Sequence, residues 1–354
     1  MAFVGTINSD VHFRNRIING AMMVDQRNSG ASITLTSSGV YPVDRWRCDE
    51  ASDGAATGEQ VQDAPAGFVD SLKITTTTAD ATLASTQYLA INQFIEGFNT
   101  ADFNWGSANA KTITLSFWVK SSLTGTFAGG IDNNGGDRTY IFNYTISAAN
   151  TWEYKTITIA GDTSGTWATG NTRGLGLRFG LGSGTGFEGT VGAWQTGSKF
   201  SSSGAVSIIG TLNATWQITG VQLEVGSVAT PFERRPHGLE LQLCQRYYYR
   251  LISTERCPVC TCGAYISTIA FGVVTFPVSM RTAPDIDQSS TANQFYVTGN
   301  AASGAFNSFA YNERGPDSIT LYNNESVSMT QGYAYWFRTN ASYTGQKLAF
   351  TAEL

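Results

Sequence analysis

The stretch GVQLEVGSVATPFERRPHGLELQLCQRYYYR, residues 220–250, joins two different secondary-structure patterns. Val221, Leu223 and Val225 alternate with polar residues, which is the period of a half-buried strand. After Pro236, apolar residues recur at three- and four-residue spacing, as in an amphipathic helix of about three turns. These residues are Leu239, Leu241, Leu243, Cys244, Tyr247 and Tyr248. The stretch therefore predicts a strand that closes one domain and a linking helix over residues 236–250.

The composition on both sides of this junction is that of a β protein. Charged residues make up 14% of the chain, against about 25% in ordinary globular proteins. The 38 glycines and the Thr/Ser runs supply turns and polar strand faces, and helical periodicity is otherwise missing. Short strand patterns separated by Gly, Asn and Asp clusters predict a jelly-roll β-sandwich over residues 31–235. Residues 1–30 show little hydrophobic periodicity and are expected to form an extended arm.

Three strand patterns in this first domain place notable side chains opposite the core. The patterns cover residues 112–120, 174–180 and 221–225. The outward side chains are Trp118, Arg178, Gln222 and Glu224. Because Arg178 is flanked by glycines, we expect it to stand in an open groove. An aromatic ring, a guanidinium, an amide and a carboxylate on one face would suit a sugar-binding surface, and packing against another subunit is the alternative.

The second domain, residues 251–354, carries strand patterns that become rich in tyrosine. Near its end, Tyr333, Tyr335 and Phe337 alternate with Ala334, Trp336 and Arg338. This period of two predicts that Trp336 and Arg338 face outward, so the aromatic cluster that includes Tyr333 and Tyr335 is a second candidate binding surface. A smaller C-terminal β-sandwich of about this length is thin for a domain that stands alone. That thinness and the run Tyr247, Tyr248, Tyr249 favour oligomerisation.

Four segments together resemble a family of bacteriophage tail-fibre and related virion proteins. The junction TPFERRPHGLELQLCQRYYYR (230–250) resembles the corresponding junction in that group. NRIINGAMMVDQRNSG (15–30) with YPVDRW (41–46) resembles the opening of its first β domain. TLSFWVKSSLTGTF (114–127) resembles a central strand, and FPVSMRTAPDI (276–286) resembles the start of its C-terminal domain. The order and spacing of the segments carry the resemblance.

The resemblance implies a tail fibre in the virion, usually a homotrimer, that contacts the host surface and recognises a surface glycan or other receptor. Residues 1–30 would then attach the fibre to other tail or capsid proteins. A non-catalytic structural component, such as a capsid decoration, collar or baseplate protein, is the alternative function. A polysaccharide depolymerase is a third, because such enzymes also occur as virion fibres and spikes.

Charge and hydropathy argue against other classes of partner. The net charge is −5 without a basic block, so no nucleic-acid partner is expected. No apolar run approaches the ~20 residues of a membrane span, and the first residues do not resemble a secretory signal. Membrane insertion is therefore not expected. We expect the chain to be synthesised in the host cytoplasm.

Motifs for metal binding and catalysis are weak. Cys257, Cys260 and Cys262 make a zinc candidate for which Cys244 and His237 are the only possible completions. Free thiols are favoured over zinc and over a disulfide formed after release, and no cofactor is expected. The segment IDNNGGDR, residues 131–138, is typical of a hairpin turn. Neither of the two histidines lies in a plausible pocket, and nothing in the sequence distinguishes a pair of carboxylates. We therefore expect no catalytic residues.

Overall fold

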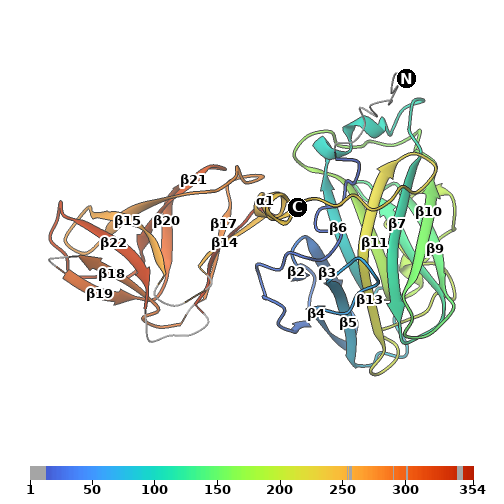
Figure 1. Cartoon of the computed structure of the whole chain (residues 1–354), viewed down its shortest axis with the longest axis horizontal. Helices are drawn as coiled ribbons and strands as arrows, with labels where there is room; N and C mark the ends of the chain where they lie inside the picture. Colours follow the sequence, from blue (N-terminus) through green and yellow to red (C-terminus); the bar gives the residue numbers. More distant parts are fainter. Residues whose placement is uncertain (1–12, 253, 255–256, 290, 300–301, 341–345) are drawn as a thin grey trace, which may run out of the picture. The chain divides into compact units, whose positions relative to one another are not determined.

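The computed structural model describes residues 13–252, 254, 257–289, 291–299, 302–340 and 346–354. It divides into two compact units, residues 1–240 with Leu354, and residues 241–353. Both units consist of antiparallel sheets, and the described residues contain one α-helix (Figure 1). The predicted all-β class is confirmed.

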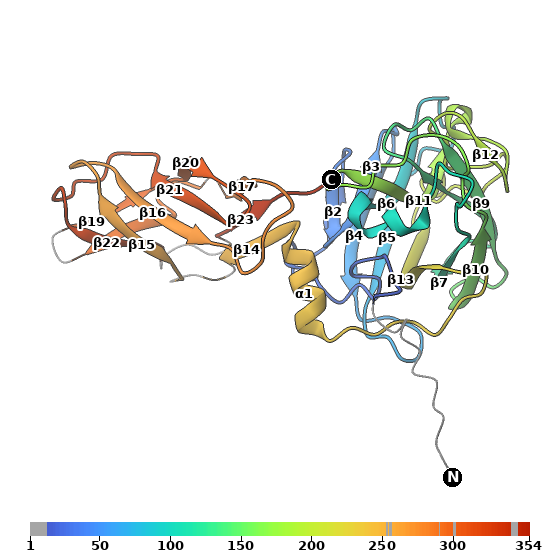
Figure 2. The ribbon, with the colours of Figure 1, turned by 90° about the horizontal axis from the view of Figure 1, so that it is seen from above.

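The first unit is a sandwich of two sheets, seen as two layers in Figure 2. The six-stranded sheet has the order β1 (Ile33–Leu35), β4 (Ala55–Val61), β5 (Ser71–Thr78), β13 (Thr215–Val225), β7 (Ile113–Ser121), β10 (Glu153–Ile159). The seven-stranded sheet has the order β12 (Trp194–Gln195), β9 (Thr139–Ile146), β8 (Gly125–Asp132), β11 (Arg173–Ser183), β6 (Tyr88–Glu96), β3 (Trp46–Glu50), β2 (Val40–Val43). Three short 3-10 helices connect strands: η1 (Gly97–Asn99), η2 (Ala101–Phe103) and η3 (Thr185–Phe187).

The core of this sandwich lies between the two layers. On β7, Ile113, Leu115, Phe117 and Val119 are fully buried, as the alternation predicts. Large rings from both sheets fill the space between them, including Phe179 of β11 against Trp216 of β13 at 5.6 Å between ring centroids. The hairpin predicted at residues 131–138 is confirmed, because β8 and β9 pair on either side of it.

Residues 13–30 belong to the first unit, which corrects the arm predicted to extend to residue 30. Ile17 and Met22 are fully buried in the core of the sandwich. The backbone N–H of Arg16 donates to the carbonyl of Leu223 at 2.9 Å, and the Asn15 side chain donates to the carbonyl of Val221 at 3.0 Å. Residues 1–12 of the predicted arm lie outside the described residues. The sequence pattern missed this segment because asparagine side chains, rather than a regular ladder, hold it to β13.

The linking helix α1 (His237–Gln245) is shorter than predicted. Tyr248 and Tyr249 instead begin β14 (Tyr248–Ile252), where they pair with Thr351 and Phe350. The chain itself buries Tyr247 and Tyr248, so the argument for oligomerisation from an exposed tyrosine run is wrong.

The second unit contains two further antiparallel sheets. The three-stranded sheet has the order β14, β23 (Leu348–Thr351), β17 (Asp285–Gln288). The seven-stranded sheet has the order β19 (Ala302–Phe306), β18 (Phe295–Gly299), β22 (Ala334–Thr339), β15 (Pro258–Ala264), β16 (Ala270–Thr275), β21 (Ser318–Asn323), β20 (Phe309–Arg314). Its core includes a cluster of Phe295, Phe306, Phe309 and Phe337, whose rings contact one another.

The burial of Ile17 predicts a large loss of stability on truncation. Ile17→Ala should lower the free energy of unfolding by about 2–5 kcal/mol, because the surrounding side chains can only partly refill the space. Urea denaturation of the full chain measures this change. Phe13→Ala, at a half-exposed ring in the same segment, is the control and should change little. Equal stabilities of Ile17→Ala and the parent would show that the segment is a peripheral arm after all.

Candidate functional site

Trp118 and Arg178 lie on opposite outer faces of the first sandwich. Trp118 is on β7 of the six-stranded sheet, and Arg178 is on β11 of the seven-stranded sheet. Neighbouring residues of both point into the core, so the two side chains point away from each other. The expectation that they line one binding face is therefore wrong.

Arg178 also does not stand in an open groove. Its Nε donates to Asp132 at 3.1 Å, its guanidinium lies 3.8 Å from Asp49, and 12% of the side chain is exposed. Asp132 also pairs with Arg173, and the guanidiniums of both arginines lie over the ring of Phe94. Burial lowers the pKa of Arg173, which Asp132 partly offsets. The carboxylates of Asp132 and Asp49 thus occupy the Arg178 guanidinium, so it does not stand open to a ligand.

Gln222 and Glu224 are also occupied within the chain. Both side chains point outward from β13 as predicted, but both are buried. Glu224 accepts from the backbone N–H of Thr230 at 2.8 Å, and Gln222 accepts from the backbone N–H of Glu233 at 2.7 Å. They fix the segment that leaves β13, because that segment folds back over them. The expectation that Gln222 and Glu224 are exposed and contact a ligand is therefore wrong.

Trp118 remains at the surface, within a group of aromatic and charged side chains on the six-stranded sheet. Trp118 pairs in register with Tyr154 of β10, and their ring centroids are 5.3 Å apart with planes tilted by 47°. Tyr154 is 45% exposed. Lys120, two residues along β7, lies over the ring of Trp152 at 5.1 Å. The four side chains thus form one pair of aromatic rings and one cation–ring pair.

Asp63, in the loop between β4 and β5, connects these side chains. Its carboxylate accepts hydrogen bonds from Lys120, from Gln217 at 3.2 Å and from Trp152 Nε1 at 3.4 Å. The bond from Lys120 is the main reason why the pKa of Asp63 lies below its usual range, so the group is charged at neutral pH. About half of its side chain remains exposed. We call Asp63, Trp118, Lys120, Trp152 and Tyr154 the Trp118 face.

Sequence reasoning found only Trp118 of this face. The alternation in WEYKTITI, residues 152–159, does place Tyr154 outward, which was the available signal. The pairing of β10 with β7 and the position of Asp63 depend on contacts between distant segments, which no local pattern contains.

The second predicted surface, on β22, has the predicted orientation in part. Trp336 is 48% exposed and Phe337 is buried, so Trp336 and Arg338 face outward as predicted. Arg338 lies over the ring of Tyr296 at 4.9 Å and donates to the hydroxyl of Thr298 at 3.0 Å. This face combines an exposed indole with a guanidinium that neighbouring side chains already hold.

Two tyrosines of that surface need correction. Tyr335 is 1% exposed, and its hydroxyl accepts from the backbone N–H of Thr330 at 2.9 Å, so it belongs to the core. Tyr333 is exposed, although the alternation places it on the buried side. The reason is that Tyr333 precedes β22, which begins at Ala334, so the period of two does not reach it.

The cysteine cluster does not form a metal site in the structure. Within the described ranges, no three His, Cys, Asp or Glu side chains are grouped so that they could hold a metal ion. Burial raises the pKa of Cys260 to about 11 and that of Cys262 to about 12, which keeps both thiols protonated. The zinc candidate Cys257, Cys260, Cys262 therefore has no support from the grouping of side chains in these ranges.

Among the residues that the structure describes, no helix is long and apolar enough to cross a membrane.

Comparisons with known proteins find low similarity only. No family model and no curated protein matches the sequence. Similar solved structures include a tailspike protein 4 domain of bacteriophage CBA120, at 13% identity and a TM-score of 0.32, over 60% of this chain and 22% of that one. A family 11 carbohydrate-binding module from Clostridium thermocellum matches at 11% identity and a TM-score of 0.30, over 56% of this chain and 98% of the module. The module TmCBM61, in complex with β-1,4-galactotriose, matches at 9% identity and a TM-score of 0.26, over 60% of this chain and 99% of the module. At these values the likeness carries no argument about what this chain binds.

The structural role of Asp132 can be tested by removing its charge. Asp132→Asn should lower the free energy of unfolding by about 3 kcal/mol or more, because two largely buried guanidiniums lose their shared partner. Asp102→Asn is the matched control, since the half-exposed pair of Asp102 and Arg16 contributes about 0–1 kcal/mol. Thermal and urea unfolding measure both. Unchanged stability of Asp132→Asn would return Arg178 to the set of ligand-binding candidates.

Proposed function

We propose that this protein binds carbohydrate through the Trp118 face. The observation that carries the proposal is the pairing of Trp118 with Tyr154 beside the Lys120–Asp63 pair. Pyranose rings have apolar C–H faces that stack on aromatic rings, and their hydroxyls need charged or polar hydrogen-bonding groups at the edge. Trp118, Lys120 and Tyr154 lie on the paired strands β7 and β10, and hydrogen bonds from Lys120 and Gln217 hold Asp63 beside them, so these groups are in place before a ligand arrives.

The Trp118 face is preferred over the Trp336–Arg338 face for a physical reason. In the second unit, Arg338 already donates to Thr298 and lies over Tyr296, so it has less capacity for a ligand. The half-exposed carboxylate of Asp63 keeps free acceptor positions next to two rings. The β22 face is thus the second candidate.

At a finer level, we propose that the protein is a virion tail-fibre component that attaches the particle to glycan on the host surface. The support is the resemblance to that family of residues 15–30 with 41–46, 114–127, 230–250 and 276–286. Attachment to other virion proteins would then fall to residues 1–12, since residues 13–30 are packed on the sandwich. A structural virion component without receptor binding is the alternative, and a depolymerase is the third.

Substitution of the two stacked rings tests the carbohydrate proposal. The full chain should bind defined members of an array of bacterial surface polysaccharides. Trp118→Ala and Tyr154→Ala should each weaken that binding by about 1–3 kcal/mol, the cost of a true contact residue. Trp336→Ala serves as the matched control and should bind like the parent. Binding that is lost in Trp336→Ala and kept in Trp118→Ala would move the site to the second unit, and a parent that binds nothing would favour the structural alternative.

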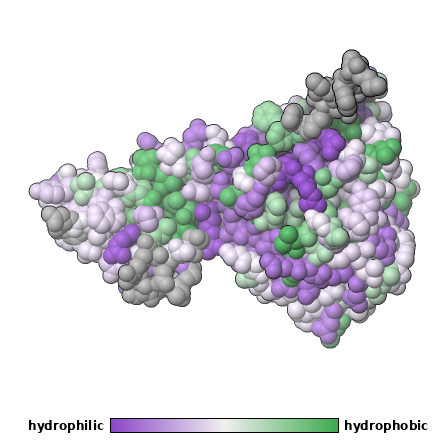
Figure 3. All heavy atoms as spheres, viewed as in Figure 1, coloured by the Kyte–Doolittle hydropathy of each residue, from purple (hydrophilic) through white to green (hydrophobic). Residues whose placement is uncertain are grey.

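The homotrimer is proposed from the resemblance and from exposed apolar side chains of the second unit. Tyr265 and Val273 are 68% and 57% exposed, and Figure 3 shows apolar residues gathered over part of this unit. Such a surface is typical of a protein contact. Light scattering at micromolar concentration should return three times the chain mass of 38.0 kDa. A mass near 38.0 kDa would contradict the trimer.

A further inference from the structure

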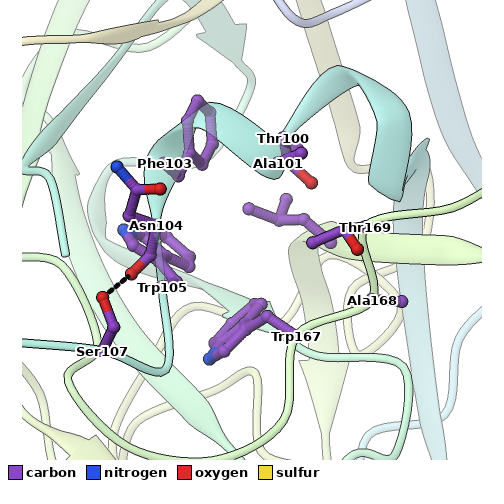
Figure 4. Close-up of a pocket in the computed structure, with 10 residues that line it drawn as sticks. Thr100, Ala101, Phe103, Asn104, Trp105, Ser107, Trp167, Ala168 and Thr169 are labelled. Carbon is purple, nitrogen blue, oxygen red and sulfur yellow. Dashed lines mark hydrogen bonds between the residues drawn. The ribbon is translucent and has the colours of Figure 1, made fainter. Parts of the chain in front are cut away.

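The first unit contains a cavity that is separate from the Trp118 face. It has a volume of about 230 Å³ and lies between η2 and the loop of residues 161–170. Figure 4 shows the side chains of Phe103, Trp105, Trp167 and Thr169 around the hollow, with Asn104 and Ser107 on one side of it. None of the residues singled out from the sequence lines this cavity.

The walls of the cavity are aromatic and fixed in orientation. The rings of Trp105 and Trp167 meet edge to face, 4.6 Å apart at 78°, and Trp194 packs against both. Trp105 Nε1 donates to the carbonyl of Lys111 at 2.8 Å, and Trp167 Nε1 donates to the carbonyl of Ser164 at 3.2 Å. Because the indole N–H groups are satisfied internally, the parts of these rings that line the cavity are carbon, with Trp167 more exposed than the buried Trp105.

The loop that carries Trp167 is held by a buried ion pair. Asp162 is 1% exposed and accepts from Arg138 at 2.7 and 2.6 Å. The backbone of the same residue accepts from the N–H of Gly106 at 2.7 Å, and the Asn133 side chain donates to the carbonyl of Thr166 at 3.0 Å. A binding wall fixed in this way loses little conformational entropy when a ligand binds.

The rim supplies polar groups without charge. Asn104 is exposed and has a left-handed backbone, with φ of 54°, which turns the chain at the edge of the cavity. Thr169 adds an exposed hydroxyl, and the Ser107 hydroxyl donates to the carbonyl of Asn104 at 2.7 Å. All ten lining residues are uncharged. The Trp118 face, in contrast, contains Asp63 and Lys120.

We infer that this cavity is a second carbohydrate site, which takes one neutral pyranose ring at the end of a glycan. The volume lies below the ~300–1,000 Å³ of pockets for drug-sized ligands, so it suits a single ring. Aromatic carbon faces match the C–H face of the sugar, and the amide and hydroxyls of the rim match its hydroxyls. The uncharged lining excludes uronic and sialic acids, whose carboxylate would lose water without a partner. The inference rests on the proposed carbohydrate class but not on the Trp118 face.

Saturation-transfer NMR of the full chain tests the inference. The probes are methyl glycosides of glucose, galactose, mannose, rhamnose and N-acetylglucosamine, with methyl glucuronoside as the charged comparison. At least one neutral glycoside should give a saturation-transfer signal, with the affinity of about 1–10 mM expected for a single small ring. The charged glycoside should give none.

Three variants identify the place of binding. Trp167→Ala should weaken the binding of the neutral glycoside by about tenfold or more, as for a central aromatic contact. Asn104→Gly keeps the left-handed turn, removes the amide and should weaken binding less, which covers the case that Trp167→Ala fails to fold. Phe98→Ala is the matched control, because Phe98 is an exposed ring on η1 that does not line the cavity.

The outcomes separate this inference from the proposed function. Binding of a neutral glycoside that is lost in Trp167→Ala and kept in both Phe98→Ala and Trp118→Ala supports the cavity site. Absence of any neutral signal, or a signal unchanged in Trp167→Ala and Asn104→Gly, overturns it. If polysaccharide binding that depends on Trp118 persists in that case, the proposed function stands. In that case the cavity would instead bind a side chain of another protein.

Discussion

The pairing of β7 with β13 is the contact on which the first unit depends. The two strands pair in register over most of their length, and each alternates between a core face and an outer face. The inner face carries Phe117 and Trp216 into the core, and the outer face carries Trp118. Asn15 and Arg16 then donate to the carbonyls of Val221 and Leu223 on β13, and the carbonyl of Gly20 accepts from the N–H of Val221. A shift of this pairing by one residue would exchange core and surface along the strand and remove both the sandwich and the proposed binding face.

Local alternation predicted which side chains share a face, but not which sheet carries them. Alternation between neighbouring residues was enough to predict two things. It predicted the strands over residues 112–120, 174–180 and 221–225, and it predicted that Trp118, Trp336 and Arg338 face outward. The placement of Trp118 and Arg178 on different sheets could not be predicted, because it depends on the pairing of β11 with β6 and of β13 with β7. The burial of the polar side chains of Arg178 and Glu224 could not be predicted either. The partner of Arg178 comes from the distant strand β8, and the partner of Glu224, six residues further on, covers it only because the chain folds back after β13.

The first unit presents two surfaces of different chemistry. The Trp118 face is open and charged, because Asp63 and Lys120 form a pair beside the rings. The cavity at Trp105 and Trp167 is small and uncharged. An extended polymer fits the open sheet, whereas a single ring fits the cavity, so the two proposals call for different parts of a glycan. The buried pairs of Asp132 and Asp162 with arginines hold the seven-stranded sheet and the cavity loop in place.

The central claim is that carbohydrate lies on the outer face of the six-stranded sheet. A crystal structure of the full chain with an oligosaccharide that it binds tests this most directly. The account predicts sugar density over the rings of Trp118 and Tyr154, with hydroxyls within hydrogen-bonding distance of Asp63 or Lys120. Density over Trp336 and Arg338, with the Trp118 face bare, would contradict it.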